Sequence, residues 1–208
     1  RRHLQQGNTL AQMPEKVAIQ LNDTHPAVSV VELMRLLVDV HGVDFDDAWE
    51  ISSKTFSYTN HTLLPEALES WPVPLFERLL PRHMQLVYAI NAKILLDARK
   101  NRGFNDHEIR QISLIDESGD RRVRMGNLAF MGSHSINGVS ALHTELMKET
   151  VFADLHKLYP DRINNKTNGI TPRRWLMQCN PGLFNLVREA IGDAFADDAE
   201  ALSALDRF

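Results

Sequence analysis

The sequence predicts a helix-rich α/β fold in which helices cover a parallel sheet. Short stretches at residues 17–21 and 55–58 alternate apolar and polar residues, as half-buried strands do. Each is followed by a polar loop, and the loop at residues 22–25 leads into apolar residues at helical spacing. Strand and helix therefore alternate along the chain, which favours a parallel, helix-covered sheet over a sandwich or a helix bundle.

The composition is that of an ordinary globular protein, and it excludes several classes. Of the 208 residues, 43% are hydrophobic and 24% are charged, which argues against disorder. A formal net charge of -4 argues against a nucleic-acid partner. No run of about eighteen apolar residues and no secretory leader is seen, so no membrane partner is expected. The single cysteine, Cys179, fits a reduced, cytoplasmic protein and is expected to be buried rather than nucleophilic.

The first strand-to-helix connection lies at residues 22–25. The strand is expected at residues 17–21, Pro26 suits a first helical turn, and apolar residues then repeat at helical spacing up to Gly42. Asp23 lies in this loop. A carboxylate just before a helix often caps it or forms a turn, and this structural interpretation stands beside a functional one.

The second connection lies within residues 58–69, where the sequence pattern changes from that of a strand to that of a helix. A strand leads into it, and Pro65 with Glu66 predicts the first turn of a helix. His61 lies between them, flanked by hydroxyl and amide side chains. Ligands tend to bind where the strands of an α/β sheet end, and histidine titrates near neutral pH. A solvated or capping histidine is the alternative.

Other elements follow from similar patterns. Asp44 is expected to cap a short helix at residues 45–52, and a long amphipathic helix is expected between residues 74 and 102, bent or restarted at Pro81. A hairpin is predicted at residues 112–125, around a turn that contains a glycine. Three arginines of this hairpin are expected to be solvated: Arg121, Arg122 and Arg124.

A third connection is expected at residues 132–138, after an apolar stretch at residues 128–131. Two glycines bracket His134, which indicates that backbone or a ligand passes close by, although tight turns would explain them equally well. A fourth polar loop, rich in amides, precedes Thr171, expected as a helix N-cap, and Pro172, expected as the first helical residue.

Taken together, four stretches resemble the glycogen, starch and maltodextrin phosphorylases. They are Leu-Asn-Asp-Thr-His-Pro at residues 21–26, Tyr-Thr-Asn-His-Thr-Leu-Leu-Pro-Glu-Ala-Leu-Glu at residues 58–69, Gly-Ser-His-Ser-Ile-Asn-Gly-Val at residues 132–139, and Asn-Lys-Thr-Asn-Gly-Ile-Thr-Pro-Arg-Arg-Trp at residues 165–175. The resemblance runs from about Lys16 to Gly192. It does not choose between glycogen, starch and maltodextrin as the preferred glucan.

The resemblance implies part of an intracellular, homodimeric enzyme that depends on pyridoxal 5'-phosphate. Such an enzyme uses inorganic phosphate to cleave terminal α-1,4-linked glucosyl units from α-glucans, and it releases glucose 1-phosphate with retained configuration. Its fold has two Rossmann-like domains that face a cleft. By this resemblance, residues 1–168 are the C-terminal part of the N-terminal domain, and residues 169–208 are the crossover and the first helices of the C-terminal, cofactor-binding domain.

The resemblance also implies roles for individual residues. His61 would contact the glucosyl unit, through its side chain to the 6-hydroxyl and through its backbone carbonyl towards the reacting centre. The remaining implied contacts are Asp23 and His25 beside the anomeric side of the sugar, Val139 packed near it, Asn168 on a sugar hydroxyl, Glu66, Ala67 and Glu69 in the side pocket near His61, and Trp175 against the cofactor.

Three other activities are alternatives to this interpretation. Two glutamates, Glu66 and Glu69, bring a glycosidase to mind, but on one helix they would point the same way instead of flanking a bond. A metal hydrolase lacks support, because no paired His or Cys spacing occurs and His107-Glu108 has no second histidine in place. A sugar-binding module without catalysis stays open. The family's cofactor lysine lies in a Gly-Thr-Gly-Asn-Met-Lys run that is absent here, so the chain alone is expected to be inactive.

Overall fold

A computed structural model describes residues 2–208, and Arg1 lies outside the described residues. The chain divides into two compact units: the residues up to Thr167 form the first, and Asn168–Phe208 form the second. Each unit is described by itself.

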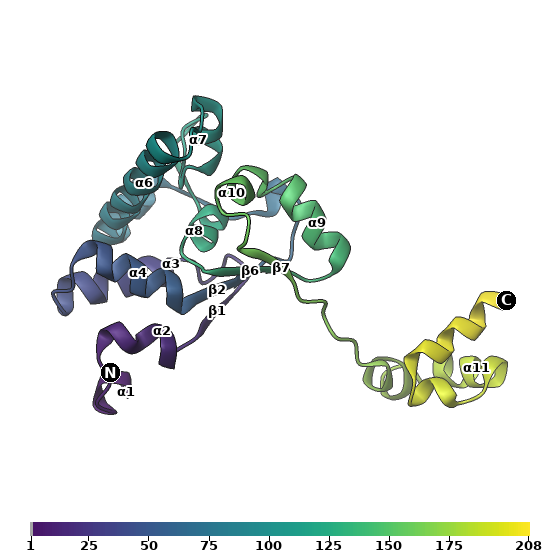
Figure 1. Cartoon of the computed structure of the whole chain (residues 1–208). Helices are drawn as coiled ribbons and strands as arrows, with labels where there is room; N and C mark the ends of the chain where they lie inside the picture. Colours follow the sequence, from purple (N-terminus) through teal and green to yellow (C-terminus); the bar gives the residue numbers. More distant parts are fainter. Residues whose placement is uncertain (1) are drawn as a thin grey trace. The chain divides into compact units, whose positions relative to one another are not determined.

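A four-stranded parallel sheet forms the centre of the first unit (Figure 1). It consists of β1 (Ile19–Asn22), β2 (Phe56–Thr59), β6 (Ser135–Gly138) and β7 (Ile163–Asn165), in the order β1-β2-β6-β7. All three pairings are parallel. The prediction of a parallel, helix-covered sheet is therefore confirmed.

The register of this sheet separates an apolar face from a polar one. Leu21 lies opposite Tyr58, and Tyr58 lies opposite Ile136; all three have 0% exposure. The other face carries only polar side chains, exposed or half-buried: Gln20, Asn22, Ser57, Thr59, Ser135, Asn137 and Asn164. Three of them, Gln20, Thr59 and Asn137, form a polar row. Gln20 Nε2 donates to Thr59 Oγ1 (2.9 Å), which donates to Asn137 Oδ1 (2.8 Å).

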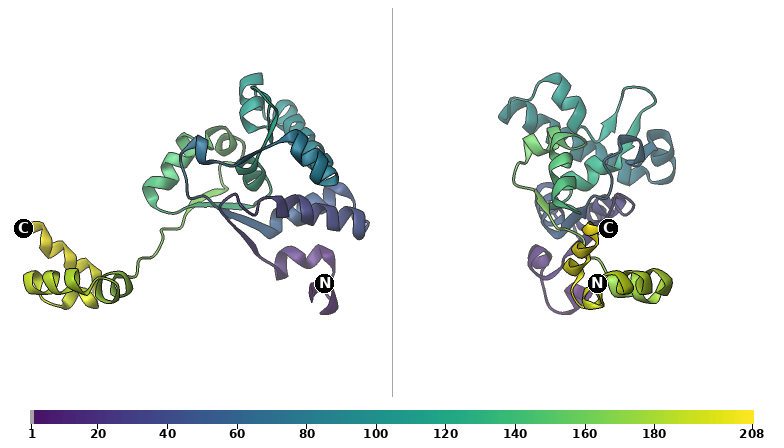
Figure 2. Two further views of the ribbon diagram at one scale, coloured as in Figure 1. Left: turned by 180° about the vertical axis from the view of Figure 1, so that it is seen from behind. Right: turned by 90° about the vertical axis from the view of Figure 1, so that its right-hand side faces the viewer.

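Helices pack on the apolar face. Figure 1 shows α6, α8 and α10 on one side of the sheet, and Figure 2 shows the same arrangement from behind. The helical segments of this unit are α1 (Arg2–Gln5), η1 (Leu10–Gln12), α2 (Met13–Lys16), α3 (Val28–Arg35), η2 (Leu36–Val40), α4 (Phe45–Thr55), η3 (Pro65–Ala67), α5 (Val73–Leu79), α6 (Pro81–Asn101), α7 (Asp106–Ile112), α8 (Met125–Met131), α9 (Ala141–Glu149) and α10 (Ala153–Leu158). Their apolar residues form one core with the strands, in which Phe152 packs edge-on against Tyr58 at 6.1 Å between ring centroids.

Several helix ends follow from the residues expected there. Asp44 caps α4 by accepting a hydrogen bond from the backbone N–H of Asp46 (2.8 Å). Gly42 has φ +66°, a conformation that suits glycine after the helical turn η2. The long apolar segment restarts at Pro81, as predicted.

A small antiparallel sheet has the order β3-β5-β4, with β3 at Ser70–Pro72, β4 at Ile115–Asp116 and β5 at Arg122–Arg124. The predicted hairpin is confirmed. The prediction that its arginines are solvated is wrong for two of them. Arg122 donates to Ser70 Oγ (2.7 Å) and Arg124 donates to the Arg110 carbonyl (2.7 Å), and both side chains are half-buried.

The third strand-to-helix connection was placed wrongly. Residues 128–131 belong to helix α8, and the strand is β6, which coincides with part of the expected loop. Every residue of α8 is buried, so no polar face reveals its helical period, and a short apolar run of this kind cannot be told from a buried strand.

The flanking glycines serve close packing. A Cβ on Gly132 would lie 2.6 Å from Val30 Cγ1 in α3, and one on Gly138 would lie 2.9 Å from Thr144 Cα in α9. The groups that approach these glycines therefore belong to the protein itself.

The prediction of a helix that starts at Pro65 is also wrong. Only the short 3₁₀ turn η3 forms there, and the chain then enters β3. The backbone of Leu68 is extended at φ -74° and ψ 123°, which ends the helical turn.

The second unit is a small helical assembly. It contains η4 (Arg173–Gln178), α11 (Pro181–Ile191), η5 (Ala194–Ala196) and η6 (Ala199–Arg207). Its core is built on Phe184 and Phe195, whose ring centroids lie 5.1 Å apart. Cys179 is exposed, so its predicted burial is wrong: it follows η4, outside this small core.

Candidate functional site

The strands of the central sheet end at one edge, and most of the residues singled out from the sequence lie there. Asp23 and His25 follow β1, His61 follows β2 and Val139 follows β6. In a parallel sheet the carboxyl ends of neighbouring strands lie together, so these loops are neighbours. We call the loops after β1, β2 and β6 the carboxyl edge.

Asp23 has an unusual backbone conformation. Its φ is +63°, and it is the one non-glycine residue with positive φ among those described. Side chains with a Cβ rarely adopt this conformation, although aspartate tolerates it better than most. Two hydrogen bonds hold it: the Asp23 N–H donates to the Thr59 carbonyl (3.0 Å), and Asp23 Oδ1 accepts from the Thr24 N–H (2.6 Å). Such conformations persist where the surrounding structure imposes them, often at functional sites.

His61 is exposed and has one side-chain contact. Its Nε2 lies 2.7 Å from Asn22 Oδ1 at the end of β1. An amide oxygen only accepts, so this contact requires the proton on Nε2. That leaves Nδ1 free to accept a hydrogen bond from a hydroxyl group.

Asn60, directly before His61, is completely buried at 0% exposure. Its N–H donates to the Asn137 carbonyl (3.0 Å), its Nδ2 donates to Tyr58 Oη (3.0 Å), and its Oδ1 accepts from His143 Nε2 (3.0 Å). Burial raises the pKa of the Tyr58 hydroxyl well above its usual range. Sequence reasoning noted Asn60 only as a polar neighbour of His61. Its burial depends on α9, which no local pattern reveals.

Glu69 links two elements at the carboxyl edge. Its Oε2 accepts from the buried Thr24 hydroxyl (2.9 Å) and lies 3.4 Å from His25 Nδ1. Glu69 follows η3 and does not share a helix with Glu66, so the geometric ground for setting aside a glycosidase was wrong. Glu66 and Ala67 are both exposed on η3.

A cavity of about 230 Å³ adjoins His25 and Glu69. Its remaining lining is apolar: Val28, Trp71, Leu75, Phe76, Leu79, Leu80 and Met125. Trp71 is 42% exposed and Leu79 is 63% exposed. A mostly apolar cavity with a few polar side chains has the general composition of a small-molecule site.

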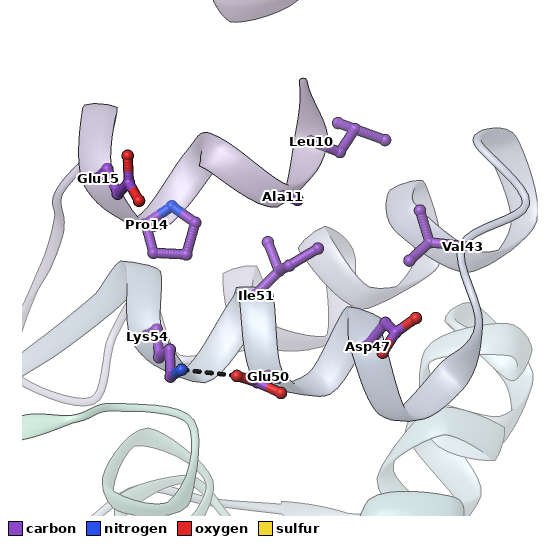
Figure 3. A pocket seen from close by; sticks show the side chains of 9 residues that line it. All are labelled: Leu10, Ala11, Pro14, Glu15, Val43, Asp47, Glu50, Ile51 and Lys54. Atoms are coloured by element: carbon purple, nitrogen blue, oxygen red, sulfur yellow. Dashed lines mark hydrogen bonds and ion pairs between the residues drawn. The ribbon is translucent and has the colours of Figure 1, made fainter. Parts of the chain in front are cut away.

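A larger cavity, of about 600 Å³, lies between the N-terminal segments and α4 (Figure 3). It contains a Glu50–Lys54 ion pair at 2.6 Å. Its walls come from η1, α2 and α4. Since α2 and α4 each end where β1 and β2 are about to begin, this cavity lies towards the amino ends of the strands. It therefore does not join the residues of the carboxyl edge.

Asn168 and Trp175 belong to the second unit and are both exposed there, Trp175 at 70%. The helical turn η4, which carries Trp175, begins at Arg173, and its N-cap is Pro172 rather than the predicted Thr171. The Trp175 N–H donates to the Thr171 carbonyl (3.1 Å).

Among residues 2–208, no helix combines the length and hydrophobicity needed to span a bilayer. In the same residues, no three or more His, Cys, Asp or Glu side chains are grouped so that they could hold a metal ion.

Comparison with known proteins gives consistent matches. A sequence model of the family described as "Carbohydrate phosphorylase" matches residues 1–208. The chain is 53% identical over 192 residues to the brain form of glycogen phosphorylase from Rattus norvegicus, and equally to that from Homo sapiens. It is 48% identical over 206 residues to glycogen phosphorylase from Synechocystis. These alignments cover 92% to 99% of this chain but only 23% to 24% of the relatives, so the chain spans about a quarter of their length.

Proposed function

Because this chain belongs to the carbohydrate phosphorylase family, we propose that it supplies the sugar-side wall of an α-glucan phosphorylase active site. The intact polypeptide would complete that site. The reaction would transfer a terminal α-1,4-linked glucosyl unit from a glucan to inorganic phosphate and release glucose 1-phosphate.

One observation carries the proposal. The three motifs within residues 21–26, 58–69 and 132–139 each contain the carboxyl end of one of three adjacent parallel strands, so the residues that follow these strands share one sheet edge. Asp23, held in a left-handed conformation, and His61 are joined there through Thr59 and Asn22. Ligands of open α/β sheets bind at this edge.

In this proposal His61 is the central residue. Its free Nδ1 accepts a hydrogen bond from the 6-hydroxyl of the glucosyl unit, and its backbone carbonyl points towards the reacting carbon. A carbonyl dipole stabilises positive charge that develops on the sugar ring in the transition state more than it stabilises the ground state. In this proposal, His61 does not transfer a proton during the reaction.

The other residues shape the sugar pocket. Asp23 and His25 face the anomeric side, and Val139 packs near the ring. As the resemblance implies, Asn168 forms a hydrogen bond with a sugar hydroxyl. The side pocket next to His61 is formed by Glu66, Ala67 and Glu69.

The family's cofactor, pyridoxal 5'-phosphate, is not anchored by these 208 residues. The exposed indole of Trp175 offers a flat surface for its ring. No lysine side chain in residues 2–208 is buried, and none lies in the cofactor-binding run. The isolated chain is therefore expected to be inactive, and the proton transfer of the reaction belongs to parts of the intact polypeptide outside it.

A phosphorolysis assay tests this function. The 208-residue chain and the intact polypeptide are incubated with maltoheptaose and phosphate, with and without pyridoxal 5'-phosphate, and released glucose 1-phosphate is measured. We expect release only from the intact polypeptide with the cofactor. Absence of release there would refute the proposal. Binding of maltoheptaose to a naturally 208-residue protein would instead support a sugar-binding module.

A histidine substitution in the intact polypeptide tests the site. We expect His61→Ala to lower kcat about fivefold, because it removes a hydrogen bond to the 6-hydroxyl that is worth about 1 kcal/mol. Since the His61 side chain is exposed, the melting temperature of the His61→Ala variant should differ little from that of the wild type. His134→Ala is the matched control: it also removes an exposed imidazole, but one that precedes β6 at the opposite edge. Equal kinetics for the two variants would contradict the assignment.

We also propose that the intact polypeptide is a cytoplasmic homodimer, as the family resemblance implies. Sedimentation analysis of the intact polypeptide checks the oligomeric state, and fractionation of the source cells checks the location.

A further inference from the structure

We propose that Asn60 and His143 are positioning residues for His61, and that they fix the backbone of the turn after β2. This inference rests on the proposed function, because it concerns how the sugar-contacting residue is held in place.

His61 cannot hold its own position. Its side chain is exposed, and its one side-chain hydrogen bond joins it to Asn22. Exposed side chains with a single contact keep much of their rotamer freedom. The location of the His61 carbonyl and Cα is therefore set by the backbone that leads into the turn.

Asn60 supplies that constraint. It is buried, and its three hydrogen bonds reach three different elements: β6 through the Asn137 carbonyl, β2 through Tyr58 Oη, and α9 through His143 Nε2. The backbone bond continues the β2–β6 pairing one residue past the end of β2. Because both the backbone and the side chain of Asn60 are fixed, the backbone of His61 can adopt few positions.

His143 is itself well held. It lies in the first turn of α9, where its N–H donates to the capping Ser140 Oγ (3.1 Å). Gly138 has no side chain, which lets the start of α9 approach the end of β6. Partial burial lowers the pKa of His143, and the nearby His61 lowers it further when charged. A neutral imidazole with its proton on Nε2 is the form that donates to Asn60 Oδ1.

The competing explanation is that His143 only attaches α9 to the sheet. Thr144 also attaches α9 to the sheet, since its Oγ1 lies 3.2 Å from Asn165 Oδ1 in β7. Among the described residues, no hydrogen bond joins Thr144 to Asn60. Thr144→Val therefore weakens the α9 attachment without touching the proposed positioning path.

The kinetic test uses the intact polypeptide with three variants: His143→Leu, His143→Gln and Thr144→Val. Chain extension is measured with glucose 1-phosphate and with 6-deoxyglucose 1-phosphate, which lacks the hydroxyl that His61 is proposed to bind. We expect His143→Leu to lower kcat/KM for glucose 1-phosphate about five- to tenfold, the size expected for one buried hydrogen bond. The 6-deoxy substrate should lose less, because it loses only the contribution of the His61 carbonyl, so discrimination between the two falls.

The variants also separate positioning from attachment. His143→Gln keeps a side-chain N–H near the original position and should restore most of the discrimination. Thr144→Val should lower the melting temperature while it leaves the discrimination as in the wild type. If Thr144→Val and His143→Leu reduce discrimination equally, His143 is only an attachment and the inference is wrong.

A second measurement does not depend on activity. In the 208-residue chain, imidazole NMR signals of His61 should shift in His143→Leu and stay unchanged in Thr144→Val. Should His143→Leu fail to fold, Asn60→Ser replaces it with the same expected outcomes. An inactive wild-type polypeptide would refute the proposed function, whereas unchanged His61 signals in His143→Leu, or in Asn60→Ser where it replaces His143→Leu, would overturn the positioning inference alone.

Discussion

The left-handed backbone of Asp23 can be tested by a pair of substitutions that differ only in a Cβ. Asp23→Gly and Asp23→Ala both remove the carboxylate and its hydrogen bond to the Thr24 N–H. They differ in how well they tolerate φ +63°. Glycine adopts this conformation freely, whereas alanine places its Cβ against the backbone.

The magnitude follows from two opposing effects. The left-handed conformation costs alanine roughly 1–2 kcal/mol. Glycine loses roughly 0.4–1 kcal/mol more than alanine in backbone entropy on folding. The net result should favour Asp23→Gly over Asp23→Ala by about 1 kcal/mol in the free energy of unfolding. The order is the reverse of that at an ordinary helix or strand position, where alanine is the more stable residue.

Urea unfolding of the 208-residue chain measures this difference, with circular dichroism as the signal and the slope of the transition checked for equality between variants. Asp23→Asn is the control, because asparagine tolerates the left-handed region and keeps an oxygen acceptor. We expect it to lie near the wild type. If Asp23→Ala proves as stable as Asp23→Gly, the backbone at residue 23 is not held in the left-handed region.

Two further predictions concern packing and pH. Gly138→Ala should lower stability by about 2 kcal/mol through overlap with Thr144, while Gly119→Ala, which meets no atom within 4 Å, should not; equal melting temperatures would contradict this. A hydrogen bond from Arg35 lowers the pKa of Glu32 to about 2. Glu32→Gln should therefore cost stability at pH 7, by less than about 1 kcal/mol for this partly exposed pair, and the difference should shrink as pH falls from 4.5 towards 2. A difference that persists at pH 2 would contradict it.

The sequence was most informative where local chemistry decides the structure. The strand before Asp23, the cap at Asp44, the restart at Pro81 and the hairpin near Gly119 all depend on neighbouring residues, and all are confirmed. The helix-rich α/β class and membership of the phosphorylase family are confirmed as well. The site roles of residues such as His61 remain predictions.

The predictions failed where residues far apart in the sequence determine the local structure. Helix α8 is buried on every side, so its sequence has no period to detect. Arg122 is drawn from solvent by Ser70, more than fifty positions away. Asn60 was overlooked because its importance depends on His143, a partner on another helix. Patterns within a window of ten residues contain none of these contacts.

The polar row of Gln20, Thr59 and Asn137 has a consequence for folding fidelity. Successive residues of a strand point to opposite faces, so a slip of one position would push these side chains into the core and expose Leu21, Tyr58 and Ile136 to water. Each mispaired strand would lose both its apolar burial and its cross-strand hydrogen bonds. The row therefore favours the observed register of β1, β2 and β6 over registers shifted by one residue.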